Sequence, residues 1–308
     1  MLPRVGTIFA NWNYFLAIGP LEIMRQKLIG LLPALVLTFS LPLFCFAQQQ
    51  QSNQPQKQEP QKKKKKFIKE VYLSWGYNKE WYTHSSLHVS QPSLGNDYTM
   101  EHVKAHDHPG WNEGLFTEAL SIPQYNYRLG FLLDEEKGWG FEINFDHTKY
   151  IISDQDVHIK GRMNNQPVDQ TIAFNEANGF YYYLNNGANF LLFNVTKRWH
   201  LWKTHDEKIK VDAYGKFGVG PVIPHTQNEL FGKANHSGFQ FGGWNTGTEW
   251  VVRTTFFRAF YLEYSNKLDY ARYSGINIYE GKGHQAFGTY EMILSLGITI
   301  PTVHPWWR

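Results

Sequence analysis

Trp139-Gly-Phe-Glu-Ile-Asn-Phe-Asp146 is the stretch of this 308-residue chain that decides its fold. Its large apolar side chains occupy every second position, at Trp139, Phe141, Ile143 and Phe145. Glycine, glutamate, asparagine and aspartate fill the positions between them. A period of two places neighbouring side chains on opposite faces of a β-strand, whereas a helix repeats every three to four residues. The stretch therefore predicts a strand with one apolar face and one polar face.

The same alternation recurs from Phe67 onward, in a chain rich in aromatic residues and glycine. This mixture is typical of β-structure with aromatic side chains at membrane interfaces. The alternating segments lie at 71–78, 126–131, 139–146, 187–200, 209–223, 239–253, 257–272 and 290–298. Each is about long enough to cross a membrane when tilted. The pattern predicts an all-β fold, an eight-stranded antiparallel up-and-down transmembrane β-barrel.

The connections between these segments alternate in length. Short ones lie at 134–138, 201–208 and 253–257, long polar loops at 85–121 and 152–186, and medium ones at 225–238 and 273–284. Short turns on one side and long loops on the other are the asymmetry of outer-membrane barrels. We therefore expect an integral outer-membrane protein with extracellular long loops and with both termini in the periplasm.

A soluble barrel that holds a small ligand is the competing fold, and the two faces of the strands argue against it. The apolar face carries residues too bulky for the interior of eight strands, so it should face lipid. The polar face should pair its charges inside a narrow, plugged lumen. The cations expected there are Arg128, Lys216 and Lys267, and their partners are Glu142, Asp212, Glu249, Glu263 and Glu291. Aromatic girdles are expected from Trp75, Trp139, Trp199, Trp244, Trp250 and Tyr264.

The N-terminal region reads as a targeting segment. Residues 24–47 combine a short basic start, an apolar stretch and a small residue at Ala47, which is the pattern of a signal peptide. Residues 1–23 are then an upstream over-reading, and 67–308 form the barrel. A membrane anchor helix is the alternative, disfavoured by Pro33 and Pro42. Lipid attachment at Cys45, the single cysteine, is disfavoured because Phe44 precedes it.

Residues 48–66 are rich in glutamine and lysine and have nothing apolar to bury, so they predict a disordered periplasmic arm. The five lysines from Lys62 to Lys66 are either solvated or bind anionic headgroups or a periplasmic partner. They account for the formal charge of +3, so no basic face indicates a nucleic-acid partner.

Three histidines of the first long loop are candidate metal ligands. His102, His106 and His108 are spaced by four and two residues beside Asp107. Neutral imidazoles at such spacing bind zinc or another divalent metal when a scaffold fixes them. Polar loop surface is the alternative role, and no cofactor other than a divalent metal is indicated.

A second group stands where strands reach the long-loop side, at Asp146, His147, Lys149 and His225. On the strand period Lys149 shares the lipid-facing side with Phe145, where its ammonium group would meet a lipid phosphate. His147 or His225 would then act as acid or base. The alternative is a polar rim that marks the end of the hydrocarbon zone.

Four stretches together resemble the bacterial lipid A oxidase family of outer-membrane barrels. They are Lys137–Tyr150, Gly187–Trp199, Tyr214–His225 and Arg258–Tyr264, and the resemblance covers roughly 122–300. It implies oxygen-dependent oxidation of the proximal glucosamine of lipid A to an aminogluconate unit, with a divalent metal as a possible aid. The motif positions of this chain that it implicates as catalytic are Asp146, His147, Lys149 and His225.

Two functions stay open. No serine-hydrolase elbow, phosphate loop or HExxH motif is present, which favours a binding or complex-subunit role at the lipopolysaccharide-containing outer membrane. Partners would be lipids, lipopolysaccharide, or proteins reached through 85–121, 152–186 or the 48–66 arm. The alternative is a lipid A-modifying oxidase that acts at the outer leaflet.

Overall fold

The computed structural model describes residues 67–108, 124–184 and 187–302. The chain divides into two units, Met1–Lys62 and Lys63–Arg308, and every described residue belongs to the second unit. The expected signal peptide at 24–47 and the lysine-rich arm at 48–66 lie outside the described residues.

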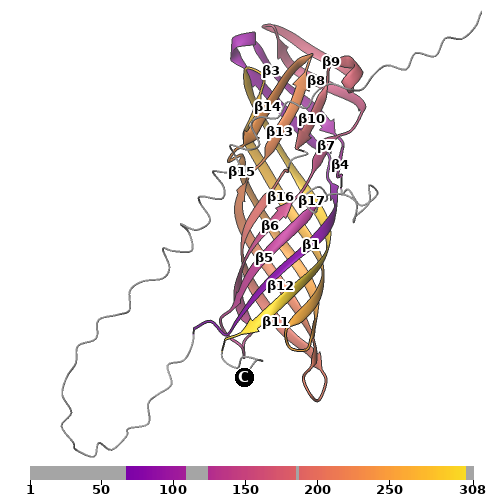
Figure 1. The fold of residues 1–308 in the computed structure, drawn as a ribbon. Helices are drawn as coiled ribbons and strands as arrows, with labels where there is room; N and C mark the ends of the chain where they lie inside the picture. The colour runs from indigo at the N-terminus through magenta and orange to yellow at the C-terminus, as the bar shows by residue number, and fades with distance from the viewer. Residues whose placement is uncertain (1–66, 109–123, 185–186, 303–308) are drawn as a thin grey trace, which may run out of the picture. The chain divides into compact units, whose positions relative to one another are not determined.

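Eight strands of the described part of the chain close into an antiparallel ring (Figure 1). In ring order they are β1 (Glu70–Tyr82), β5 (Tyr125–Leu132), β6 (Trp139–His147), β11 (Phe190–Lys203), β12 (Ile209–Val222), β15 (Gly243–Phe256), β16 (Phe260–Ile278) and β17 (Gly281–Pro301). Strand β1 closes the ring, because it pairs with β5 on one side and with β17 on the other. Since ring order is chain order, the topology is up-and-down, and the predicted antiparallel β-barrel is confirmed.

Side chains of the ring alternate between a buried and an exposed face, as the sequence pattern predicts. On β6, Glu142, Asn144 and Asp146 are fully buried, whereas Trp139 is 48% exposed. Of the expected girdle residues, those that are at least 40% exposed are Trp139, Trp199, Trp244, Trp250 and Tyr264. A protein in water shows the reverse, with charges outside and apolar residues inside. The apolar exterior therefore calls for hydrocarbon around the barrel.

The strand length agrees with a bilayer. Residues 290 to 300 of β17 carry the exposed apolar side chains Tyr290, Leu294, Leu296, Ile298 and Ile300. This stretch is about 34 Å long, and about 25 Å when tilted by ~40°, which is the height of an apolar belt. Among the described residues, no helix is long and apolar enough to cross a membrane.

The short connections lie at one end of the barrel, which we call the lower end. They are the turns at 133–138, 204–208 and 257–259. Glu70 lies opposite both Pro301 and Leu132, so the first and last strands begin and end at this same end.

The connections at the upper end are long, as predicted, but the expectation that they are irregular polar loops is wrong. The segment 85–121 contains β2 (Ser85–Gln91), η1 (Pro92–Leu94), β3 (Asn96–Val103) and β4 (Ala105–His106) among its described residues. The segment 152–186 contains part of β7 (Tyr150–Ile152), then β8 (Gln155–Met163), β9 (Gln166–Phe174), η3 (Glu176–Asn178) and β10 (Tyr181–Leu184). The segment 225–238 forms the hairpin β13 (His225–Leu230) and β14 (Lys233–Phe239). The expected loop at 273–284 is also wrong, because β16 and β17 run through it and turn at Tyr279-Glu280.

These upper strands form a structure that we call the cap, made of β2–β4, β7–β10, β13, β14 and the upper ends of β16 and β17. Strand β2 pairs with β17 and continues the barrel sheet through β3, β8 and β9 (Figure 1). A second sheet has the order β14-β13-β10-β7-β4. The two sheets enclose an apolar core whose fully buried members include Leu87, Val89, Met100, Ile159 and Leu184. The cap therefore has the apolar interior that the barrel lacks.

Polarity inverts along single strands where the barrel meets the cap. Inward positions of β16 carry Glu263, Lys267 and Asp269 below, and Ala271 and Tyr273 above, all of them buried. Outward positions change at the same height, from Leu268 and Tyr270 to Arg272, all of them exposed. Both faces therefore change at one level, which marks the upper boundary of the apolar belt.

Candidate functional site

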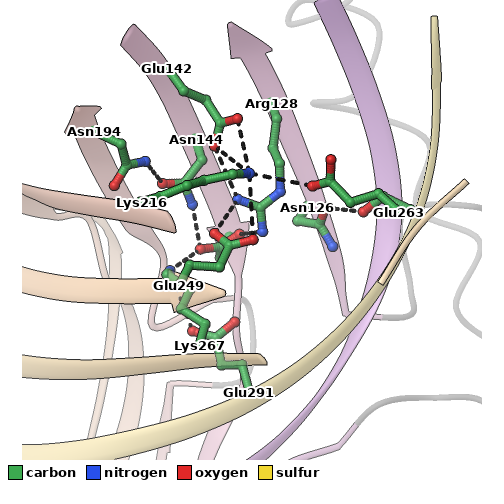
Figure 2. A network of polar contacts seen from close by, with 12 residues as sticks. Asn126, Arg128, Glu142, Asn144, Asn194, Lys216, Glu249, Glu263, Lys267 and Glu291 are labelled. Atoms are coloured by element: carbon green, nitrogen blue, oxygen red, sulfur yellow. Dashed lines mark hydrogen bonds and ion pairs between the residues drawn. The ribbon is translucent and has the colours of Figure 1, made fainter. Parts of the chain in front are cut away.

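The barrel lumen holds a network of buried charges (Figure 2). The Arg128 guanidinium lies 3.4 Å from the Glu142 carboxylate and 3.0 Å from that of Glu249. The Lys216 ammonium lies 3.0 Å from Glu142, 3.5 Å from Glu249 and 3.3 Å from Glu263. These groups come from β5, β6, β12, β15 and β16, so one network joins most of the barrel wall. The expected pairing of Arg128 and Lys216 inside a narrow lumen agrees with these contacts.

Arg253 is a lumen cation, although the sequence pattern predicts a short connection at 253–257. It lies within β15, is 1% exposed and donates to the Glu263 carboxylate at 2.7 Å. Its guanidinium also lies over the rings of Tyr72, Tyr214 and Tyr261, at 4.2, 4.4 and 4.0 Å from the ring centroids. Three aromatic faces and one carboxylate therefore surround this buried charge and stabilise it. The group fills the lumen below Arg128 and Lys216.

Lys267 is the cation of the upper lumen. It pairs with Asp146, with Asp269 at 2.9 Å and with Glu291 at 3.6 Å. All four side chains are at most 5% exposed. Asp212, expected in this network, instead pairs with His200 at 2.9 Å near the lower end. It does so because it stands near the start of β12, away from the lumen cations.

A layer of aromatic rings separates the charged lumen from the cap core. Tyr150 and Phe287 stack with centroids 4.3 Å apart, Tyr273 lies 5.3 Å from Phe287, and Tyr82 lies 4.9 Å from Tyr150. The Tyr273 hydroxyl donates to the Ala188 carbonyl at 2.9 Å, and that of Tyr82 donates to the Lys149 carbonyl at 2.8 Å. The described interior is therefore filled at two successive levels, by ion pairs below and by rings above.

The structure divides the four candidate catalytic residues between different surroundings. Asp146 points into the lumen toward Lys267. His147, the next residue, stacks on Tyr125 with centroids 4.5 Å apart, and its Nδ1 lies 2.8 Å from Asn189 Oδ1. Because neighbouring strand residues point to opposite faces, Asp146 and His147 do not form an acid–base pair.

His147 and His225 lie on either side of the segment 187–189. Asn189 accepts from His147 Nδ1–H through its Oδ1 and donates through its Nδ2 to the Ile223 carbonyl at 2.9 Å. The backbone N–H of His225 donates to the Gly187 carbonyl at 2.9 Å, and its ring lies 5.0 Å from that of Phe239. The segment 187–189 therefore links the two positions. The two-residue period of the sequence does not predict this role of Asn189.

Lys149 does not take the expected place on the exposed exterior. Strand β6 ends at His147, so the two-residue period does not extend to Lys149. The residue is 6% exposed, whereas exterior residues of the belt such as Phe193 are 44% exposed. The expectation of a lysine presented to lipid phosphate on the outer face is therefore wrong.

The histidines expected to bind a metal do not converge. Within the described ranges, no group of three or more histidine, cysteine or acidic side chains is arranged to hold a metal ion. His102 and His106 are both exposed, and His106 Nδ1 lies 2.8 Å from Ser153 Oγ. Partial desolvation of its ring lowers the pKa of His106 below its ordinary value. The backbone N–H of His108 lies 3.3 Å from Gln124 Oε1.

Asp107 has the structural role in this segment. Its carboxylate pairs with Lys79 and accepts from the backbone N–H of Glu80 at 2.8 Å. It therefore ties the segment after β4 to the upper end of β1.

No family model matches this sequence, and no curated protein matches it. Among solved structures, the chain is similar to the outer membrane protein OprG from Pseudomonas aeruginosa, with 9% identity and a TM-score of 0.35 over 76% of this chain and 97% of that one. Neisserial surface protein A shows 8% identity and a TM-score of 0.29, over 74% of this chain and 96% of that one. Ail of Yersinia pestis, in complex with the heparin analogue sucrose octasulfate, shows 12% identity and a TM-score of 0.29, over 76% of this chain and 99% of that one. These identities are too low to transfer a function, and the resemblance to lipid A oxidases stays a prediction.

Proposed function

We propose that this chain is an integral outer-membrane β-barrel that conducts no solutes and presents its cap for binding at the cell surface. The observation that carries the proposal is the contrast between a lumen filled with ion pairs and a cap with its own apolar core. An apolar belt around a polar lumen suits a bilayer, and a cap with its own apolar core suits water. The short turns and both termini then lie in the periplasm.

A transport role for the lumen is disfavoured by its contents. Arg128, Arg253 and Lys267 are each at most 1% exposed and each pairs with carboxylates. Opening a path would require breaking buried ion pairs, each costing about 3–5 kcal/mol when one partner is lost. The aromatic layer of Tyr82, Tyr150, Tyr273 and Phe287 would have to move as well.

The cap offers a specific mode of protein binding. Strand β9 is the last strand of its sheet, and within the described residues it pairs with β8 alone. An edge strand presents unpaired N–H and C=O groups that a strand of a partner can complete. Most β9 residues are exposed, including Asp169 and Thr171. This edge lies in the segment 152–186, for which the sequence predicts a partner surface, and its exposure supports protein binding there.

Oxidation of lipid A is the alternative function. It is motivated by the family resemblance and by the proximity of His147 and His225 to the segment 187–189. Against it, Asp146 is paired with Lys267 in the lumen and Lys149 is buried. We therefore rank binding above catalysis.

Three measurements test the proposal on the full chain. A folded barrel shifts its mobility on a gel when it is boiled, and a protein that fractionates as soluble would overturn the membrane assignment. Purification in mild detergent with the substitution Thr171→Pro, which removes an edge N–H, should lose a partner that Thr171→Val retains. A barrel that always elutes alone would count against binding.

Mass spectrometry of lipid A from cells with and without the gene decides the alternative, since identical spectra exclude oxidation.

A further inference from the structure

A groove of about 300 Å³ lies in the barrel wall where β1, β16 and β17 meet. Its walls include three exposed side chains: Trp81 is 47% exposed, Leu268 is 49% exposed and Tyr290 is 37% exposed. The rings of Trp81 and Tyr290 have centroids 5.6 Å apart. The outward wall of the groove is therefore apolar and aromatic and is continuous with the apolar belt. The rest of the lining is Tyr82, Thr83, Asp269, Gly288 and Thr289.

A glycine leaves the space for the groove. Gly288 lies opposite Tyr270 on β16, at an outward position of β17. Thr83 fixes its backbone: Thr83 N–H donates to the Gly288 carbonyl at 2.9 Å, and Gly288 N–H donates to Thr83 Oγ1 at 2.9 Å. A Cβ on Gly288 would lie 3.1 Å from Thr83 Cγ2, so a branched side chain there would fill the groove and crowd its wall.

The groove lies at the upper boundary of the belt. Leu268 lies opposite Tyr290, and Tyr270 lies opposite Gly288, which is the level at which both faces of β16 change polarity. At this level the acyl chains of a bilayer meet the headgroups, where tyrosine and tryptophan concentrate.

A cation stands one step above the groove on the same face. Arg272 follows Leu268 and Tyr270 on the exposed face of β16 and lies opposite Ala286. Diagonal neighbours across a strand pair lie about 7–8 Å apart, so the Arg272 side chain can reach over Gly288. Among described residues Arg272 has no carboxylate within ion-pair distance, whereas Lys79, beside Trp81, is neutralised by Asp107. Arg272 therefore presents positive charge to the headgroup zone.

We propose that this groove seats an acyl chain of an outer-leaflet lipid whose anionic phosphate headgroup is bound by Arg272. A lipid is the occupant because the groove opens onto the apolar belt and carries its cation only on the headgroup side. Arginine binds phosphate through two parallel N–H donors. The proposal rests on the proposed function, since it needs the barrel in the membrane with the cap outside.

The test uses the full-length protein, reconstituted in bilayer discs and analysed by native mass spectrometry for retained lipid. One set of discs contains phosphatidylcholine alone, and the other contains phosphatidylcholine with bis-phosphorylated lipid A. Arg272→Gln removes the headgroup contact, and Gly288→Leu fills the groove. Arg162→Gln, whose side chain is 65% exposed on β8, and Trp250→Ala, 55% exposed on β15, are the matched controls. The gel shift on boiling is recorded for every variant.

We expect the wild-type chain and both controls to retain lipid A in preference to phosphatidylcholine. We expect Arg272→Gln to lower this retention by about fivefold to tenfold, because a charge-assisted hydrogen bond is lost. Gly288→Leu should lower it at least as much. If all variants that still show the gel shift retain equal amounts of lipid A, the groove is not the lipid-binding site, although the barrel assignment stands. Equal retention of the two lipids by the wild-type chain would overturn the role of Arg272. A chain that does not enter discs and shows no gel shift would refute the proposed function itself.

Discussion

Replacing Lys267 by methionine should unfold the barrel far more easily, because it removes the cation shared by three buried carboxylates. Lys267 is 1% exposed and pairs with Asp146, Asp269 and Glu291. Losing one partner of a buried ion pair costs about 3–5 kcal/mol, since the remaining charge has neither water nor a counter-ion. Among the described residues, Asp269 and Glu291 have no other ion-pair partner, whereas Asp146 keeps Arg128 at 3.7 Å. Because two carboxylates lose their cation at once, we expect the upper part of this range for the free energy of unfolding.

The double variant Lys267→Met with Asp269→Asn separates charge from packing, because Lys267 is the one ion-pair partner of Asp269 among the described residues. Removing one of the carboxylates should recover about 1–3 kcal/mol, as expected for residues of one ion-pair network. Lys203→Met is the matched control, since Lys203 pairs with Glu207 at the surface and is 48% exposed. An exposed pair contributes at most about 1 kcal/mol.

Urea unfolding in detergent micelles measures these differences, with tryptophan fluorescence and the gel shift as two independent signals. A decrease in the free energy of unfolding no larger for Lys267→Met than for Lys203→Met would contradict the prediction. A double variant less stable than Lys267→Met would contradict it too, because the carboxylate would then not be the destabilising group.

The cap and its histidines allow two further predictions. Ile159→Ala should cost about 2–5 kcal/mol in the cap core, because a fully buried side chain is lost, and should make the cap sensitive to protease while the gel shift persists. If the cap stays resistant, it is not held by this core. Partial desolvation lowers the pKa of the exposed His106, so the unfolded chain takes up a proton more readily than the folded one. The stability of the cap should therefore be full above the ordinary histidine pKa and fall as pH drops below it; His106→Gln should flatten this decline, and an unchanged pH profile would contradict the assignment.

The barrel could be predicted from the sequence because its signal is repeated on every strand. Gly140, Glu142, Asn144 and Asp146 alternate with large apolar residues, and one such strand already requires two different surroundings. The charge pairs of the lumen followed from the same pattern, since a buried cation needs a carboxylate partner. Arg253 was missed because its strand was ended too early.

The cap could not be predicted in the same way. Its strands are short and mix serine, histidine and threonine with few apolar residues, as in Ser85–Gln91, where only Leu87 and Val89 belong to the core. Such segments read as polar loops because the buried face depends on a second sheet that is distant in sequence. The position of Lys149 was missed for a related reason: a two-residue period says nothing beyond the end of its strand, and β6 ends at His147.

The end of the alternating pattern on β16 is itself informative. The sequence pattern predicts that this strand ends at residue 272, whereas β16 continues to Ile278. Two events hide the continuation: the buried face changes from charged to apolar above Asp269, and a register shift between Ser274 and Ile276 moves the buried positions from odd to even numbers. A helix or loop would lose alternation altogether, whereas here alternation persists with its polarity exchanged. An exchange of polarity within one continuous strand is what a strand must show when it leaves hydrocarbon and enters water. It therefore marks the upper boundary of the apolar belt, and Arg272 stands just above that boundary.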